Sequence, residues 1–403
     1  MKGSTVLKSV FLSVLIALVA LPAAAQLTPK ETLGKALYFD RALSSPSNMS
    51  CAVCHEERAG FAGSNPGINK KGAVYPGAVH QRFGNRRPPT ASSAGDSPVF
   101  HYDAEEGLFI GGMFWDGRAT GWVTGDPLAD QAMGPYLNPV EQNLPSEEAA
   151  CVVVAESVYA GLYEEVFGPI DCSDYDDDGH LKAYKNFAVA VAAFERSEEV
   201  SPYDSKFDYV MAGEAEFSPQ EALGWDLFNG KAMCSACHPA PLFTDFTYDN
   251  LGVPRNPDNP FYDMDQVFVD GAPINDLGET WVDPGLAGFL SSLPEDWFEV
   301  YGLEKSAAVD ENYGKHKVPT LRNVDKRPGR GFAKAYMHNG SLKSLEEVVA
   351  FYNNRETMIA EGSIVPEVMA NMNVDELGDL GLTEEEEAAL VAFMKTLSDG
   401  YQP

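Results

Sequence analysis

The sequence predicts a mostly α protein made of two related halves, with long irregular loops between the helices. Two observations carry this prediction. A helical pattern, a short loop and a C-x-x-C-H motif occur in residues 28–55 and again in residues 218–238. The stretches between helical patterns are rich in Gly, Pro, Asn and Ser. The repetition indicates a duplicated module, so we expect one domain in residues 26–200 and a second in 201–403.

Helices are expected where apolar residues recur on one face. The first, at residues 31–42, places Leu33, Ala36 and Leu37 together. Further helical patterns cover 147–167, 181–197, a segment beginning at Ser218, and 383–397. Each is long enough to bury one face against a neighbouring helix.

Two segments are expected to be irregular. Residues 60–112 show little periodicity, and a loop of this length is uncommon in a compact domain unless it surrounds something functional. Residues 250–315 are rich in Pro, Asp and Gly, and we expect them to form a long excursion over the surface.

C-x-x-C-H is the attachment signature of c-type haem, in which two thiols form thioether bonds and the adjacent His binds iron. The two sets of residues are Cys51, Cys54 and His55, and Cys234, Cys237 and His238. The alternatives are structural disulfides or halves of a zinc ribbon. Both C-x-x-C pairs are followed by His although the chain has only 7 His, which makes coincidence a poor explanation. The sequence therefore predicts two covalently bound haem c groups.

The N-terminus is typical of a secretory signal peptide. Lys2 and Lys8 precede an apolar run over residues 10–21, and Ala23–Ala25 form a small-residue cleavage pattern. A retained membrane anchor is the alternative, but the run is short for a span. We expect residues 1–25 to be removed, leaving a periplasmic protein without a membrane span. In such an oxidising compartment, Cys151 and Cys172 are expected to form a disulfide.

The net charge of −31 argues against nucleic acid or anionic membranes as partners. It favours a basic or metal-bearing partner. A second acidic feature is the segment with Asp174, Asp176 and Asp178, which matches the D-x-D-x-D-G start of a calcium loop. Its twelfth position is Lys185, where a bidentate Glu is wanted, so a plain acidic turn is the alternative to calcium.

Several motifs in one order resemble the bacterial di-haem cytochrome c peroxidases and MauG. They are the two C-x-x-C-H motifs, FWDGR at 114–118, the Gln131 and Glu141 pair, VPTLRN at 318–323 and HNG-x-L-x-x-L-E-x-V from His338. The likeness extends from about residue 30 to the C-terminus. It implies two cytochrome-c-like haem domains, with a peroxide-reacting haem on His55 in the first and an electron-transfer haem on His238 in the second.

The resemblance also implies catalytic residues. Trp115 matches a Trp between the haems, and Gln131, Pro135 and Glu141 match residues over the N-terminal haem. A desolvated Glu141 would have a raised pKa and could carry a proton between the peroxide oxygens, while Gln131 could donate a hydrogen bond to peroxide. The alternatives are an ordinary core Trp115 and a solvated Glu141.

The sixth ligand of the C-terminal haem iron separates members of this family. It lies 14 residues after the His of the HNG block, and it is Met in the peroxidases and Tyr in MauG. Here that position is Tyr352, which is closer to MauG. A phenolate favours oxidised iron, whereas a thioether favours ferrous iron. Tyr352 as a core residue, or Met337 or Met358 as ligand, are the alternatives.

The peroxidases also carry a His ligand that must leave the peroxide-reacting iron. The matching stretch, Gly84–Thr90, has no His at that place, and we expect the nearby His80 and His101 to be surface or structural residues. This implies an iron open to peroxide. The family's calcium site would here involve Ser92 or Ser93 and the carbonyl groups of Ala333 and Ala335.

Three functions follow from these observations. The first is a MauG-like oxidoreductase in which hydrogen peroxide generates a high-valent state shared by both haems that oxidises a partner protein or another donor. The second is a peroxide-detoxifying peroxidase reduced by a small cytochrome c or a cupredoxin. The third is a non-catalytic electron-transfer protein. The trio of Gln131, Pro135 and Glu141 argues against the third, because a saturated haem needs no proton carrier.

Overall fold

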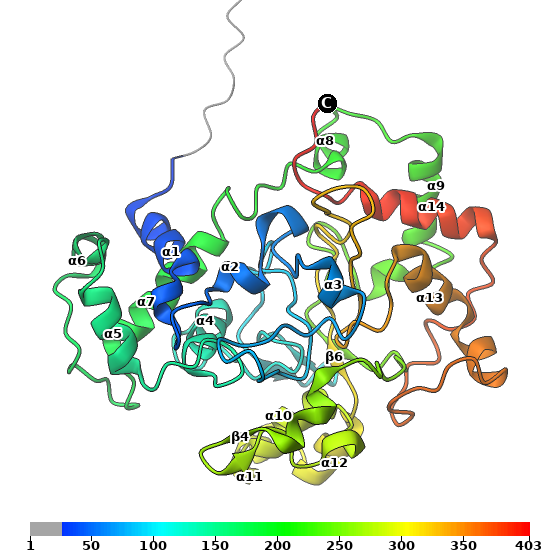
Figure 1. The fold of residues 1–403 in the computed structure, drawn as a ribbon. Helices are drawn as coiled ribbons and strands as arrows, with labels where there is room; N and C mark the ends of the chain where they lie inside the picture. Colours follow the sequence, from blue (N-terminus) through cyan, green and yellow to red (C-terminus); the bar gives the residue numbers. More distant parts are fainter. Residues whose placement is uncertain (1–25) are drawn as a thin grey trace, which may run out of the picture.

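The computed structural model describes residues 26–403, so the predicted signal peptide lies outside the described residues. Helices make up most of the regular structure (Figure 1): α1 Pro29–Phe39, α2 Cys51–Cys54, α3 Pro66–Asn69, α4 Pro127–Leu137, α5 Glu147–Ala155, α6 Ala160–Phe167, α7 Lys182–Glu195, α8 Lys206–Met211, α9 Pro219–Phe228, α10 Leu286–Ser292, α11 Glu295–Glu299, α12 Lys305–Glu311, α13 Leu345–Ala360 and α14 Glu384–Lys395. Within this range, no helix combines the length and apolar character needed to cross a membrane.

The strands are short and form three antiparallel pairs. They are β1 His101–Asp103 with β2 Leu108–Ile110, β3 Tyr248–Asp249 with β6 His316–Lys317, and β4 Phe268–Val269 with β5 Ala272–Pro273. Short 3₁₀ helices cover Arg41–Leu43, Glu57–Ala59, Cys234–Ala236, Pro260–Gln266 and Gly278–Thr280. The prediction of a mostly α fold is confirmed.

Two helical units lie at opposite ends of the molecule in Figure 1. The first surrounds α1 and α7, and its core draws on α4, α5 and α6. The second surrounds α9 and α14 together with α13. The two cores contain residues up to Val200 and from Phe207 onward, so each falls on one side of the predicted boundary at residue 200.

The first helix of each unit begins in the same way. In α1, the Thr28 side chain accepts a hydrogen bond from the Glu31 backbone N–H, and the Glu31 carboxylate accepts one from the Thr28 N–H. Ser218 and Glu221 form the same capping box at the start of α9. Pro follows the N-cap in both helices. Capping boxes satisfy backbone donors that a helix start leaves free, so the sequence itself fixes where both helices begin.

Each unit also has one close helix crossing at a glycine. A Cβ atom on Gly34 of α1 would lie 1.9 Å from the carbonyl oxygen of Ala190 on α7, and one on Gly224 of α9 would lie 2.0 Å from that of Ala389 on α14. Only glycine allows backbones this near. The two units therefore repeat a crossing as well as a motif, which supports the predicted duplication.

One predicted helix is divided. Residues 147–167 form α5 and α6, separated at residues 156–159. There, the Ser157 side chain accepts a hydrogen bond from the Tyr159 backbone N–H, and the Tyr159 hydroxyl donates to Asp40 at 2.5 Å. Such local side-chain hydrogen bonds compete with the backbone hydrogen bonds of a helix, and the tertiary hydrogen bond to Asp40 favours the break between α5 and α6. The predicted Cys151–Cys172 disulfide is present and connects α5 to the turn after α6.

The expectation for residues 250–315 was wrong in part. This segment contains α10, α11 and α12, which lie below the two helical units in Figure 1. It forms a third core with Phe100, Phe109 and Tyr248, in which Leu286, Leu290 and Phe298 are fully buried. The apolar residues of this segment are separated by Pro and Gly, so the sequence shows no continuous helical periodicity from which these helices could be predicted. Residues 60–112, by contrast, contain only short elements, as predicted.

Candidate active site

Each C-x-x-C-H motif lines its own cavity. The N-terminal cavity encloses about 1280 Å³ of space including its open mouth, and its lining contains Cys51, Cys54 and His55. The C-terminal cavity encloses about 1530 Å³ on the same measure, and its lining contains Cys234, Cys237 and His238. The predicted loop 60–112 wraps the N-terminal cavity with Val74–Pro76 and Gly84–Ala91.

The two motif histidines are held alike. The His55 backbone N–H donates to the Cys51 carbonyl and that of His238 to the Cys234 carbonyl, each at 2.9 Å. His55 Nδ1 lies 3.2 Å from the Phe61 carbonyl oxygen, and His238 Nδ1 lies 2.8 Å from that of Phe243. These bonds place the ring proton on Nδ1 and leave Nε2 as the metal-binding atom.

These residues fit haem c. All four motif cysteines are free thiols, although Cys151 and Cys172 in the same chain are paired. Burial lowers the pKa of both His55 and His238, which keeps the imidazoles neutral as iron ligation requires. A cavity, two unpaired thiols and a fixed neutral imidazole are what covalent attachment of a haem needs on each side.

Helix α4 supplies two of the predicted residues above the N-terminal motif. Gln131 and Pro135 are four positions apart, so they share one helix face, and both line the N-terminal cavity. Pro135 has no N–H, and therefore the Gln131 carbonyl has no helical donor at this turn. The Asp126 side chain caps α4 by accepting from the Leu128 N–H.

Glu141 lines the same cavity from the turn after α4. Its Oε2 accepts a hydrogen bond from the Asn138 side-chain amide at 2.8 Å, and its backbone oxygen accepts from the Ala78 N–H at 2.6 Å. Burial raises the pKa of the Glu141 carboxyl, an effect that Arg118 and Asn138 partly oppose. A carboxyl group with a raised pKa exchanges protons nearer to neutral pH.

Trp115 is buried, with 6% of its surface exposed, and it lines both cavities. Its indole Nε1–H donates to the Arg87 carbonyl at 2.9 Å, and its backbone oxygen accepts from the Lys317 N–H at 2.8 Å. The Arg87 guanidinium lies 5.4 Å from the ring centroid. Trp115 is thus fixed by one residue from each side of the predicted domain boundary.

Tyr352 lines the C-terminal cavity from α13. Leu345, Val348 and Tyr352 follow helical spacing, and all three belong to this lining. Of the alternative ligands, Met337 also lines this cavity, whereas Met358 is absent from its lining. Tyr352 and Met337 therefore both remain candidate ligands in the C-terminal cavity.

His80 and His101 lie outside the lining of the N-terminal cavity. His80 is exposed, with its Nε2 3.5 Å from the Asn48 amide, and His101 lies on β1 with its Nδ1 2.8 Å from the Val99 carbonyl. This placement agrees with surface and structural roles.

The calcium hypothesis at Asp174, Asp176 and Asp178 gains no support. Asp174 pairs with Lys182 and Asp176 with Lys185, each at 2.7 Å, so lysine ammonium groups occupy two of the carboxylates. In the part of the chain that the structure describes, the clusters of three or more converging ligand groups lie elsewhere.

One of the two carbonyl groups expected at the family's calcium position has another partner. The Ala333 carbonyl accepts from the Asn69 amide at 3.0 Å. The neighbouring Lys334 ammonium is buried and donates to three backbone carbonyls, those of Ala59, Asn323 and Lys326. Calcium at Ser92, Ser93, Ala333 and Ala335 stays a hypothesis.

Sequence reasoning missed a second carboxyl group of the N-terminal cavity, that of Glu195 on α7. It is 4% exposed, its Oε2 is buried and unpartnered among the described residues, and burial raises its pKa to about 8. The sequence does indicate that Glu195 is buried, because it falls on the same helix face as the apolar Phe187 and Val191.

A family model described as di-haem cytochrome c peroxidase matches residues 28–216. The methylamine utilization protein MauG of Paracoccus denitrificans is 34% identical over 392 residues, covering 92% of this chain and 89% of MauG. The chain belongs to the di-haem cytochrome c peroxidase and MauG family.

Other family members agree along nearly the whole chain. The cytochrome-c peroxidase IdrP1 of Denitromonas iodatirespirans is 30% identical over 374 residues, covering 92% of this chain and 81% of IdrP1. The crystal structure of the di-haem peroxidase BthA from Burkholderia thailandensis E264 matches with a TM-score of 0.72 and 28% identity, covering 93% of this chain and 90% of BthA. The protein is a di-haem peroxidase-type oxidoreductase, and the family implies two c-type haems.

Proposed function

We propose that this protein uses hydrogen peroxide to oxidise a partner protein, as its likeness to MauG suggests. Residues 26–200 form the peroxide-reacting half and residues 201–403 the half that exchanges electrons with the outside. The observation that carries this proposal is the placement of Trp115 in the walls of both cavities. An aromatic ring held between two redox centres offers a path for an electron, which a protein with two independent sites would not need.

The N-terminal cavity contains the groups that peroxide cleavage requires. When bound, the haems supply the iron chemistry and store the oxidising equivalents. Gln131 donates a hydrogen bond from its amide to orient peroxide. Because Asn138 holds Oε2 of Glu141, Oε1 would be the atom that takes a proton from one oxygen of hydrogen peroxide and delivers it to the other. Pro135 contributes an apolar ring to the cavity wall beside Gln131.

Tyr352 would be a second protein ligand of the haem iron that His238 would bind, because both residues line the C-terminal cavity. A phenolate oxygen is a hard anion, so it stabilises oxidised iron more than a thioether does. Tyr352 thereby suits the C-terminal half to share oxidising equivalents rather than to store an electron. The acidic surface, with a net charge of −31, fits a basic protein partner, and the periplasm is the proposed location.

A second candidate is a peroxide-detoxifying peroxidase reduced by a small cytochrome c or a cupredoxin. The identity of 30% with a cytochrome-c peroxidase favours it, as does the presence of Met337 in the C-terminal cavity. With Met337 as ligand, the C-terminal half would hold an electron at rest.

One experiment separates these functions. Stoichiometric hydrogen peroxide is added to the fully oxidised holoprotein, and visible, near-infrared and Mössbauer spectra are recorded over time. The MauG-like function predicts an immediate and long-lived change at both haems. Reaction only after one-electron reduction would support the peroxidase, and no reaction in either state would leave an electron-transfer protein.

A further inference from the structure

Five aromatic side chains form a continuous patch on the unit that contains α10 and α11. They are Tyr102 on β1, Trp122, Phe289 on α10, Trp297 on α11 and Tyr301, and we call them the aromatic patch. Neighbouring ring centroids in this patch lie 5.0–6.2 Å apart, which is the range of favourable aromatic contact. The described residues that line the two cavities include none of these five, so the aromatic patch is separate from the haem sites.

The aromatic patch is open to solvent. Trp122 is 43% exposed, and the other four rings are partly exposed. Val300 lies three positions after Trp297, and therefore on the same side of this short helix, and it is 80% exposed. The Trp122 indole is held in place, because its Nε1–H donates to the Phe100 carbonyl at 3.1 Å. A fixed and exposed aromatic surface suits protein binding, since little side-chain entropy is lost on contact.

Acidic side chains adjoin the aromatic patch from two segments. Glu105 and Glu106 lie in the turn between β1 and β2. The Tyr102 hydroxyl reaches this turn, where it lies 3.7 Å from the position of a Cβ atom on Gly107. Asp296 directly precedes the patch tryptophan of α11. All three acidic residues are exposed, and none forms an ion pair among the described residues.

The two segments that supply most of the aromatic patch carry no Lys or Arg. These segments are residues 88–117 and 256–304. The basic residues that follow them are already engaged, because Arg118 pairs with Asp116 at 2.7 Å and the Lys305 ammonium donates to a backbone carbonyl at 2.5 Å. The acidic rim of the patch is therefore not neutralised from within these segments, which favours a partner that brings Lys or Arg.

Packed contacts connect the aromatic patch to Trp115. The Trp115 carbonyl accepts from the Lys317 N–H at 2.8 Å, and Lys317 on β6 pairs with Tyr248 on β3. The Tyr248 ring centroid lies 6.1 Å from that of Phe100, which lies 6.1 Å from that of Trp122. A donor docked on the aromatic patch would thus be joined to the residue between the two cavities by packed rings and one pair of strands.

We propose that the aromatic patch is the docking surface for a basic protein that gives up electrons to this enzyme. The inference rests on the proposed function and adds the place where its partner binds. Aromatic anchors within a rim of charge opposite to that of the partner are typical of protein interfaces. Each docked donor gives up one electron, so two donations together with two protons reduce one molecule of hydrogen peroxide to two of water.

The first test measures binding without peroxide. The probe is mitochondrial cytochrome c, a basic protein with a one-electron haem, added to the oxidised holoprotein at low ionic strength. Val300→Lys places a positive charge beside the aromatic patch, and we expect it to weaken binding about fivefold. Val158→Lys makes the same change at a fully exposed valine between α5 and α6, and it should weaken binding less than about twofold. High salt should remove the difference between the two variants.

A second test locates the contact directly. A carbodiimide joins carboxylates of the unmodified holoprotein to lysines of bound cytochrome c, and mass spectrometry identifies the joined residues. We expect them to include Asp296 and either Glu105 or Glu106. The proposal is overturned if the joined carboxylates all lie elsewhere, as on α6. It is also overturned if the two lysine variants, each with an unchanged haem spectrum, bind cytochrome c equally well or not at all.

A third measurement separates this proposal from the proposed function. With peroxide present, Val300→Lys should raise the KM for ferrous cytochrome c about fivefold while kcat stays within about twofold. The response of the haems to peroxide alone should not change, because the aromatic patch is needed only when a donor docks. An unchanged KM would overturn the proposal. If the unmodified protein did not use peroxide at all, the proposed function would fail while the binding and cross-linking results would still decide the docking surface.

Discussion

At the residue scale, burial determines the chemistry of individual carboxyl groups. Glu141 and Glu195 both line the N-terminal cavity, and burial raises the pKa of each. They differ in their partners. Glu141 has the Asn138 amide and the nearby Arg118, whereas Glu195 Oε2 lies buried without a partner among the described residues. One is suited to exchange a proton, and the other to keep one.

Glu141→Gln is expected to slow peroxide cleavage by about 10²- to 10⁴-fold, because the amide cannot carry the proton between the peroxide oxygens. Stopped-flow spectroscopy of the oxidised protein mixed with peroxide measures this rate. Glu165→Gln, on the exposed surface of α6, is the control and should react at the normal rate. A normal rate for Glu141→Gln would remove the proposed role.

Glu195 is expected to make the protein less stable as pH rises. Its pKa is about 8 when folded against an ordinary value of 4.5, so between these values the folded state binds a proton that the unfolded state has released. Stability should therefore fall by up to about 1.4 kcal/mol per pH unit from about pH 4.5 to about pH 8.

Urea unfolding of the wild-type protein and Glu195→Gln at several pH values measures this effect. The variant should lose this part of the slope, so its advantage over the wild type should grow as pH rises. A variant with an unchanged slope would show that another group is responsible.

At the element scale, two helix crossings depend on glycine. Gly34→Ala and Gly224→Ala each place a methyl group within about 2 Å of a backbone carbonyl on the opposing helix, and we expect each to destabilise the fold by about 1–3 kcal/mol or more. Gly161→Ala on α6 meets no atom within 4 Å and should be neutral or stabilising. Chemical denaturation of the three variants measures the difference. Equal stability would mean that the helices separate without cost.

Helix α13 carries the residue that distinguishes the two candidate functions. Tyr352→Met should shorten the lifetime of the peroxide-generated spectral change at least about tenfold, because a thioether stabilises reduced rather than oxidised iron. Tyr175→Phe, at an exposed tyrosine in the acidic turn, is the control. Time-resolved near-infrared spectra provide the measurement. If the lifetime stays the same in Tyr352→Met, Tyr352 is not the ligand.

Much of this fold is visible in the sequence, for identifiable reasons. Thr28–Glu31 and Ser218–Glu221 are local capping signals, so the starts of α1 and α9 follow from a few neighbouring residues. The division between α5 and α6 is not local, because Tyr159 finds its partner at Asp40, far away in the sequence. Such tertiary partners have no periodic pattern.

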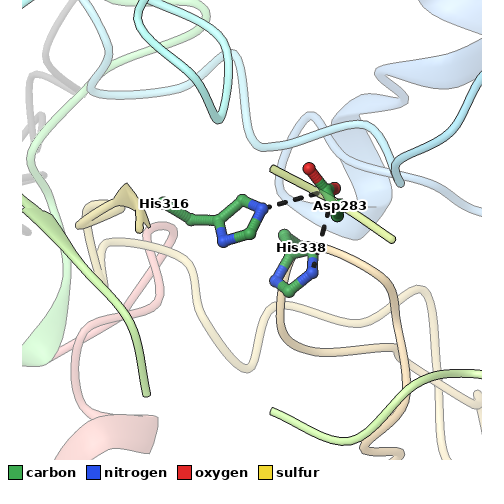
Figure 2. A group of neighbouring side chains, drawn as sticks. All are labelled: Asp283, His316 and His338. Atoms are coloured by element: carbon green, nitrogen blue, oxygen red, sulfur yellow. Dashed lines mark ion pairs between the residues drawn. The ribbon is translucent and has the colours of Figure 1, made fainter. Parts of the chain in front are cut away.

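Prediction of the candidate site from the sequence is limited in the same way. The cysteines and histidines of the two motifs were predicted from their fixed spacing, and Trp115, Gln131 and Glu141 were predicted from the resemblance to a known family. Asp283 and His316, which lie with His338 in the wall of the C-terminal cavity (Figure 2), were not predicted, because they come from within and just after the segment expected to be a surface excursion and meet His338 only after folding. A cluster assembled from three distant segments has no spacing to recognise.

At the scale of the whole molecule, Trp115 is a residue shared by the walls of the two cavities. Trp115→Phe should keep the N-terminal half reactive but delay or prevent the spectral response of the C-terminal half to peroxide, because the path between the cavities is weakened. Trp122→Phe, at a 43% exposed tryptophan, should leave both responses intact. Rapid-mixing spectra that resolve the two haems measure the delay. Simultaneous responses in Trp115→Phe would mean that electrons pass by another path.

The hydrogen bond from the Trp115 indole to the Arg87 carbonyl has a consequence for the charge that this ring would carry. An amide oxygen is far too weak a base to remove the indole proton. If the ring gave up an electron, it would remain a protonated radical cation beside the Arg87 guanidinium, 5.4 Å from its centre. Repulsion between these two positive charges would raise the ring's potential. The hole would then leave quickly and reversibly, and the indole would suffer little irreversible oxidation.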